Sequence, residues 1–256
     1  MNAYLILVGA SFLAGVMNAA AGGGSFFSFP ALLAVGVPPV NANATNTVAL
    51  WPGQIASIFA FRADLKTVRP MVLPALLASL LGGVAGAVAL LKTDQNTFLK
   101  LVPWLLLFAT VLFALSEPVM NRLRRVRTGS ENVTQAPRFS VALFIGLTIV
   151  CFYIGYFGAG SGFLIITLFS FTALEGLTQI NTLKVVCTSV ANGIAVVTFI
   201  VAGAVYWTMV PLMLVAALAG GYLGASYSRR MNPVLLKTLI IVTGFALSAY
   251  YFRGWL

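Results

Sequence analysis

The sequence predicts an all-α polytopic membrane protein made of two inverted five-element repeats, each with a short discontinuous helix after a glycine-rich break. Of the 256 residues, 60% are hydrophobic and 8% are charged, whereas soluble domains carry about 25% charged residues. Apolar runs of the length that a bilayer requires recur along the chain. Glycine clusters in 18-NAAAGGGSFFSFP-30 and 157-FGAGSGFLIITL-168 each separate a long apolar run from a shorter one.

Ten apolar elements follow one another along the chain. A membrane-spanning helix needs about 20 apolar residues, and eight runs reach or approach that length. They are residues 3–21, 43–61, 70–91, 98–117, 139–157, 182–204, 208–227 and 234–252. The pieces 25–37 and 161–174 are too short for ordinary spans. Nothing basic precedes the first run, so we interpret it as a span and not as a cleaved signal peptide.

The elements indicate an internal duplication. Each half reads long, short, long, long, long, and a basic segment separates the two series. Gly22 and Gly24 lie 138 positions before Gly160 and Gly162. The interpretation is a first membrane repeat over 1–120, a basic connector over 121–138 and a second membrane repeat over 139–256.

The basic residues predict the orientation. If the short pieces cross together with their neighbours, each half crosses five times, and an odd number inverts the second half relative to the first. With the connector in the cytoplasm, the cytoplasmic flanks hold Arg62, Lys66, Arg69, Arg122, Arg124, Arg125, Arg127, Arg138, Lys184, Arg229, Arg230 and Lys237, and the outer flanks hold Lys92, Lys100 and Arg253. This bias predicts a multi-pass protein of the cell inner membrane with connector 121–138 cytoplasmic and both termini outside. Re-entrant short pieces would change only the side of the termini.

Each glycine cluster opens a short helix, and this arrangement predicts an anion site. The first N–H groups of a helix lack internal partners and carry the positive end of the macrodipole. Glycine lets a ligand approach them, and Ser25 or Ser161 adds a hydroxyl donor. Paired discontinuous helices in matching places of two halves indicate a transporter's binding site. The alternative is that these glycines only allow close helix packing, which is our interpretation of 82-GGVAGAVA-89 and 220-GGYLGAS-226.

Polar clusters begin the next long span in each half. Asn43, Thr45, Asn46 and Thr47 begin one of these spans, and Asn181, Thr182 and Lys184 begin the other. A helix cap needs one such residue, so the surplus predicts donors that face a cavity. Lys184 either extends its ammonium group to the interface or attracts an anionic substrate. The intramembrane amides Asn18 and Asn192 require partners, from the protein or from the substrate.

Composition excludes several function classes. The chain has no histidine, and Cys151 and Cys187 lie in apolar runs without metal-ligand spacing. All five acidic residues lie in loops or at span ends, so we expect no metal site, no cofactor and no enzymatic acid–base pair. The net charge is +10, and five of the fifteen basic residues lie in the connector, which is typical of cytoplasmic retention and not of nucleic-acid binding. Expected partners are a small anion and the lipid bilayer, and the oligomeric state is not predicted.

Two motifs carry a resemblance to a known family. The stretch 20-AAGGGSFFSFPALLAVGVPPVNANATNTVALWPG-53, together with 155-GYFGAGSGFLIITL-168 and 181-NTLK-184, resembles the TauE/SafE sulfite exporter family, also called the toluene sulfonate uptake permease group. The resemblance covers nearly the whole chain. Two positions depart from it: Thr47 stands where the family often has lysine, and Thr167 stands opposite Pro30.

The resemblance implies a secondary transporter of small sulfur-containing anions such as sulfite or organosulfonates, with efflux as the direction best known for the family. By position, the implied substrate contacts are Gly22, Gly23, Gly24, Ser25, Thr45, Asn46, Gly160, Ser161, Gly162, Asn181, Thr182 and Lys184. The alternatives are an anion channel, or an importer or exporter of another small organic anion. Paired broken helices favour alternating access over an open pore.

Overall fold

The described residues form ten α-helices and a short 3-10 helix, without any strand. The structure is a computed structural model, and it describes residues 2–20, 23–128, 139–172, 174, 177–227 and 233–253. The helices are α1 (Asn2–Ala20), α2 (Ser25–Ala34), α3 (Pro39–Ala60), η1 (Asp64–Val68), α4 (Arg69–Lys92), α5 (Gln95–Thr128), α6 (Val141–Tyr156), α7 (Ser161–Ser170), α8 (Leu177–Val201), α9 (Val210–Tyr227) and α10 (Pro233–Arg253). The predicted all-α class and the order of the ten elements are confirmed.

Local chemistry sets several helix starts. Pro39 and Pro233 stand at the beginnings of α3 and α10, where the missing N–H costs nothing and the fixed φ suits a helix. Ser140 caps α6, because its Oγ accepts from the Leu143 N–H at 3.2 Å. The carboxylate of Asp94 accepts from two backbone N–H groups in the first turn of α5.

Two features differ from the prediction. Helix α5 continues to Thr128 and so includes residues 121–128 of the predicted connector, a stretch rich in arginine, which favours helices; residues 129–138 lie outside the described part. In addition, four helical segments of the described chain have the length and apolar composition to cross a membrane, where eight full-length spans were predicted. They are Asp64–Lys92, Gln95–Ser116, Thr178–Val201 and Leu235–Arg253. Helices α1, α6 and α9 contain shorter apolar stretches.

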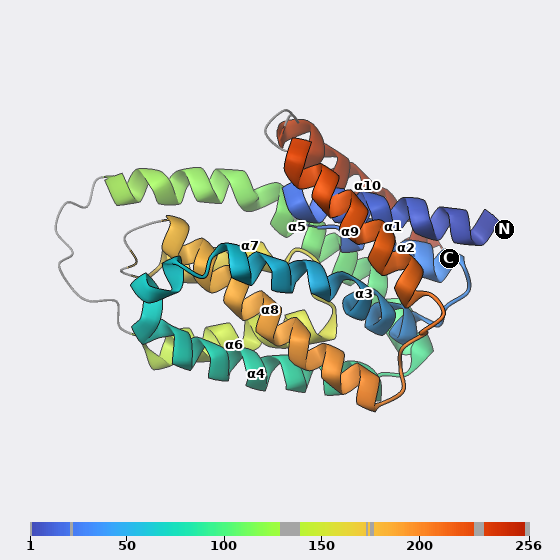
Figure 1. Cartoon of the computed structure of the whole chain (residues 1–256), viewed down its shortest axis with the longest axis horizontal. Coiled ribbons are helices and arrows are strands. Elements are labelled where there is room, and N and C mark those ends of the chain that lie inside the picture. The colour runs from blue at the N-terminus through green and yellow to red at the C-terminus, as the bar shows by residue number, and fades with distance from the viewer. Residues whose placement is uncertain are drawn as a thin grey trace.

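Helix α4 packs most extensively on α6, from the other half of the sequence. In Figure 1 the teal α4 and the yellow-green α6 run side by side. Glycines allow the contact, because a Cβ at Gly86 would overlap the Phe152 carbonyl and a Cβ at Gly155 would overlap that of Gly83. The predicted packing role of 82-GGVAGAVA-89 is confirmed.

Helix α1 packs on α9 in the same manner. A Cβ at Gly15 would overlap the Ala217 carbonyl, and one at Gly220 would overlap that of Phe12. The packing role of 220-GGYLGAS-226 is therefore confirmed as well. The glycines of the two contacts lie 138 positions apart, since 82, 83 and 86 correspond to 220, 221 and 224.

These contacts divide eight helices into two sets, which we call the α4 unit and the α9 unit. The α4 unit comprises α4, α6, α7 and α8, whose inward faces share one apolar core. The α9 unit comprises α1, α2, α3 and α9, and Ala14, Leu50 and Ala217 form a buried cluster among them. The fourth element of each sequence half thus packs with the first three elements of the other half. Helices α5 and α10 pack together, and α5 also contacts α7 and α3.

The chain exposes many large apolar side chains around this fold. Leu81, Ile149, Val215 and Tyr222 are each more than half exposed, and they come from α4, α6 and α9. Exposed apolar area on this scale is typical of a surface that faces lipid. The structure therefore agrees with the membrane setting that the composition predicts.

We predict that Gly86→Ala lowers the free energy of unfolding by about 1–3 kcal/mol, because the new methyl group must push α4 away from the Phe152 carbonyl. Thermal unfolding in detergent would measure it. Gly9→Ala is the matched control, since nothing lies within 4 Å of its added Cβ, and alanine favours a helix by up to about 1 kcal/mol. Equal melting temperatures for the two variants would contradict the prediction.

Candidate functional site

The first glycine break is closed by the helix that precedes it. Gly23 has φ +86°, a conformation that favours glycine. The Gly24 N–H, at the start of α2, donates to Asn18 Oδ1 at 2.8 Å, and a Cβ on Gly24 would overlap the Ala14 carbonyl. One backbone donor of this predicted anion site is therefore already used by the protein. Gly22 lies outside the described residues.

Asn46 bonds to both serine hydroxyls of the same break. Its Nδ2 donates to Ser25 Oγ at 3.2 Å, and its Oδ1 accepts from Ser28 Oγ at 2.5 Å. Asn46 is 2% exposed. The predicted ligands Ser25 and Asn46 are thus brought together, but they bond to each other and to α2.

Other members of the first polar cluster connect the two sequence halves. Thr45 Oγ1 accepts from the Tyr206 N–H at 3.0 Å, in the connection between α8 and α9. Asn43 Nδ2 donates to the Tyr156 carbonyl at the end of α6, also at 3.0 Å. Thr47 donates back to the Asn43 carbonyl within its own helix. The surplus of polar side chains in 43-NATNT-47 is explained largely by contacts within the protein.

At the second break, the stabilising side chain bonds to a backbone carbonyl and not to a backbone N–H. Gly158 and Gly160 have φ +79° and +71°, so the chain reverses sharply between α6 and α7. The Tyr153 hydroxyl donates to the Ala159 carbonyl at 2.7 Å. A Cβ on Gly160 would lie 3.2 Å from the Ala109 carbonyl of α5. The bond from Tyr153 secures this turn without using any N–H group of α7.

Donors at the start of α7 therefore remain open. The Ser161 N–H reaches the Gly158 carbonyl at 3.4 Å and the Phe163 N–H reaches Gly160 at 3.3 Å, both long bonds. Between them, the Gly162 N–H has no hydrogen-bond partner in the described part of the chain. The Ser161 side chain is 6% exposed, and its hydroxyl likewise has no partner among the described residues.

Lys184 lies beside these donors. A Cβ added to Gly162 would lie 3.5 Å from Lys184 Cδ, so the lysine stem passes the first turn of α7. Lys184 is half-buried, and no described residue bonds to its ammonium group. Asn181, one turn earlier on α8, is also half-buried and without a partner there. Thr182 differs, because its hydroxyl donates to the Thr178 carbonyl of its own helix at 2.8 Å.

The two breaks do not meet directly. Helices α2 and α7 do not pack along each other; instead Phe29 of α2 meets Phe157 at the second break, with ring centroids 5.5 Å apart. Phe98 of α5 packs edge-on against both rings. Aromatic side chains thus separate the predicted half-sites in this conformation.

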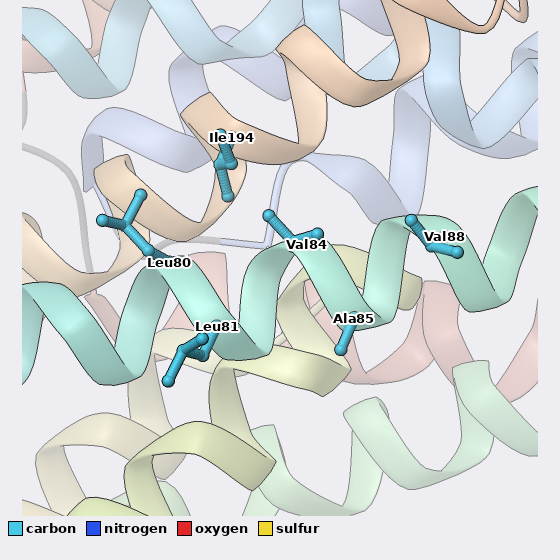
Figure 2. Close-up of a pocket in the computed structure, with 6 residues that line it drawn as sticks. All are labelled: Leu80, Leu81, Val84, Ala85, Val88 and Ile194. Atoms are coloured by element: carbon cyan, nitrogen blue, oxygen red, sulfur yellow. The ribbon is translucent and has the colours of Figure 1, made fainter.

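Two apolar grooves lie elsewhere on the molecule. The larger has a volume of about 420 Å³ and is lined by five residues of α4, Leu80 to Val88, and by Ile194 of α8 (Figure 2). A second groove of about 290 Å³ shares Leu80 and Ile194 and extends to Trp51 and Ile58 of α3. Neither groove includes any of the predicted site residues.

Comparison with known proteins decides the family. The model of the family described as Sulfite exporter TauE/SafE matches residues 7–251. The chain belongs to this family. A Haemophilus influenzae protein named probable membrane transporter protein is 28% identical over 260 residues, which cover 98% of this chain and 95% of that protein.

Two further relatives carry similar names. Probable membrane transporter protein ORF9 of Sinorhizobium is 28% identical over 93% of this chain and 88% of its own length. Probable membrane transporter protein YfcA of Escherichia coli K12 is 26% identical over 95% and 87%. No solved structure matches the chain. The protein is thus a TauE/SafE membrane transporter and not an enzyme.

Sequence reasoning missed several residues that shape this transporter. Tyr153 was not singled out, although a phenolic hydroxyl in an apolar run needs a partner. The second break uses it as the first break uses Asn18. Gln54 was also missed: it accepts from Asn192 Nδ2 at 3.0 Å across the α3–α8 contact. Gln54 and Asn192 lie 138 positions apart, the same spacing as between the glycine clusters, and this spacing could have identified the pair from the sequence.

We predict that Asn46→Ala lowers the free energy of unfolding by about 1–3 kcal/mol, because the buried hydroxyl of Ser28 and that of Ser25 lose their partner. Chemical or thermal unfolding in detergent would measure the loss. Asn181→Ala is the control, since Asn181 has no partner among the described residues, and we expect its stability within about 0.5 kcal/mol of the unsubstituted protein. A destabilisation by Asn181→Ala as large as that by Asn46→Ala would contradict this reading of the two clusters.

Proposed function

We propose that this transporter carries small sulfur-containing anions, such as sulfite or organosulfonates, and binds them at the start of α7 beside Lys184. The observation that carries the proposal is the half-buried Lys184, whose ammonium group lacks a partner among the described residues and whose stem passes the open donors of α7. A partly buried cation without a counter-ion is costly. A bound anion would offset that cost.

The donor set suits an oxyanion. The Gly162 N–H and the Ser161 hydroxyl offer directed hydrogen bonds, and the positive end of α7 adds a favourable field. Lys184 would supply a full charge, and Asn181 a neutral amide. Sulfite and sulfonate groups present several oxygen acceptors around one sulfur atom, which match several donors of this kind. The family description, sulfite exporter, supports the same substrate class.

The proposed site rests on the second sequence half. In the first half, Gly24, Ser25, Thr45 and Asn46 are already bonded to protein groups, and Asn46 occupies the position 138 residues before Lys184. These residues would therefore serve as a frame around the first break. Gly160 would set the sharp turn that exposes α7, and Thr182 would act through the conformation of α8.

The proposed mechanism is alternating access by two inverted repeats, with the family name favouring export. Reciprocal packing supports the duplication, because α4 on α6 has its counterpart in α9 on α1. The excess of basic residues around the connector supports a cytoplasmic position for 121–138 in the cell inner membrane, with both termini outside. Gradients of substrate and coupling ion would decide the direction of net flux.

We predict that Lys184→Met raises the dissociation constant for sulfite or methanesulfonate about tenfold or more, because a charge-assisted bond contributes about 1.5–3 kcal/mol. Ligand-induced thermal stabilisation of the purified protein would measure it, followed by flux into liposomes. The unfolding temperature without anion should stay the same or rise, since a partly buried charge is removed. Lys66→Met, at the half-exposed η1, is the control for net charge. Equal affinities for the Lys184 and Lys66 variants would contradict the proposal and indicate that Lys184 extends its ammonium group to the membrane interface.

A second substitution tests the backbone donors. We predict that Gly162→Ala folds normally, because its Cβ would meet only the Lys184 stem at an ordinary contact distance, yet weakens anion binding by crowding the open N–H. Isothermal titration with sulfite and methanesulfonate would measure the affinity. Gly53→Ala, with nothing within 4 Å, is the matched control. Unchanged affinity in the Gly162 variant would contradict a site at this helix start.

A further inference from the structure

We infer that the rigid bodies of the transport movement are the α4 unit and the α9 unit, and not the two halves of the sequence. Helix α4 would move with α6, α7 and α8, and α9 would move with α1, α2 and α3. The inference rests on the proposed alternating access, and it concerns which helices stay together while access changes.

The α4 unit is held by a continuous apolar core. Met71, Ala75 and Ala78 of α4 are fully buried against side chains of α6, α7 and α8, such as Leu147 and Phe169. Burial of these apolar side chains stabilises the packed arrangement. Separating α4 from the other three helices would expose this core, so the four helices are expected to move as one body.

Backbone contact stiffens the pair of helices from different halves. At Gly82, Gly86 and Gly155 there is no room for even one added methyl group between α4 and α6. Ser79 Oγ lies 3.4 Å from Cys151 Sγ in the same interface. Closely packed interfaces have discrete arrangements and do not deform continuously. Gly15, Gly220 and their partners give the α9 unit the same character.

The two units also share buried apolar side chains, and the polar contacts between them include hydrogen bonds where α3 crosses α8. Trp51 Nε1 donates to the Ser189 carbonyl at 2.9 Å, and Asn192 Nδ2 donates to Gln54 Oε1 at 3.0 Å. Ser189 Oγ also reaches the Gln54 carbonyl at 3.2 Å. Side-chain bonds of this kind can persist through small rotations, unlike interlocked backbones.

This crossing has the geometry of a pivot. Trp51 and Ser189 are related by 138 positions, and so are Gln54 and Asn192. When related positions contact each other, the contact lies on the axis that relates the two bodies, as in an isologous interface. A contact on that symmetry axis is its own counterpart, so it can be kept when the two units exchange conformations. The α3–α8 crossing is therefore the place where the two units can stay joined while they rock.

Consecutive helices of one half consequently belong to different bodies. The chain passes from α3 to α4 through residues 61–68, and from α8 to α9 through residues 202–209, which include Gly203 at φ +65°. Among the described residues, α4 packs along α6 and α8 and not along α3. Transport should therefore change the distance between α3 and α4 and leave the distance between α4 and α6 constant.

Two cross-links separate the alternatives. Ser79→Cys with the native Cys151, in a Cys187→Ala background, joins α4 to α6 across the halves but within the α4 unit. Ile58→Cys with Leu80→Cys, in a background lacking both native cysteines, joins α3 to α4 within one half but across the units. These two residues line the same groove, so a short bifunctional thiol reagent can bridge them. Each variant with one of its thiols removed is the matched control.

We expect that oxidising the first pair leaves sulfite flux into liposomes within about twofold of its control, and that bridging the second pair reduces flux at least tenfold. The opposite pattern would assign the movement to the sequence halves. Loss of flux in both variants, or in neither, would also overturn the unit assignment.

A distance measurement keeps this test independent of the substrate. Spin labels on the exposed positions Leu81 of α4 and Ile149 of α6 should give one narrow distance distribution in liposomes. Labels on Phe59 of α3 and Leu81 should give a broad or two-peaked one. A narrow distribution for the second pair with a broad one for the first would overturn the inference. Absent sulfite and sulfonate flux in the unlinked protein would contradict only the proposed substrate, because the distances would still report the units.

Discussion

The structure depends on how the backbone is satisfied where two helices stop inside an apolar protein. A bilayer provides no water for freed N–H and C=O groups, so a break survives only if the protein bonds them or lines a cavity with them. The preceding helix supplies one side chain for each break, but the two take opposite groups. Asn18 accepts from an N–H of the first break, and Tyr153 donates to a carbonyl of the second. The first choice uses a helix-start donor, and the second uses none.

That difference turns a duplicated architecture into an asymmetric one. Asn46 bonds to both serine hydroxyls of α2, whereas the hydroxyl of Ser161, at the start of α7, finds no partner among the described residues. Lys184 adds a charge to the open break, and the related position in the first half is Asn46, which is neutral. The duplication thus gives both halves the same helix break, while only the second half combines open donors with a lysine. The aromatic contact of Phe29 with Phe157 lies between the two breaks and would have to adjust if an anion passed between them.

Glycine has two separate roles in this chain. At Gly23, Gly158 and Gly160, positive φ angles allow the sharp reversals that begin the short helices. At Gly86 and Gly220, the missing Cβ lets backbones from different sequence halves touch. The second role exchanges α4 and α9 between the halves and so determines which helices form common cores. The positive φ angles expose the helix start at the candidate site, and the close backbone contacts hold the surrounding helices in fixed positions.

Much of the fold follows from the sequence, because apolar length, helix breakers and cap residues act over a few neighbours. These local signals identified ten elements in order, the two short helices and the glycine pairs at helix contacts. They also identified the family through motifs at both breaks. Pairing between distant segments was beyond them: the partners of Asn46 and Thr45 and the packing of α4 on α6 depend on contacts between residues far apart in sequence. The sequence therefore presented two equivalent half-sites, and only tertiary contacts distinguished the one already bonded from the one still open.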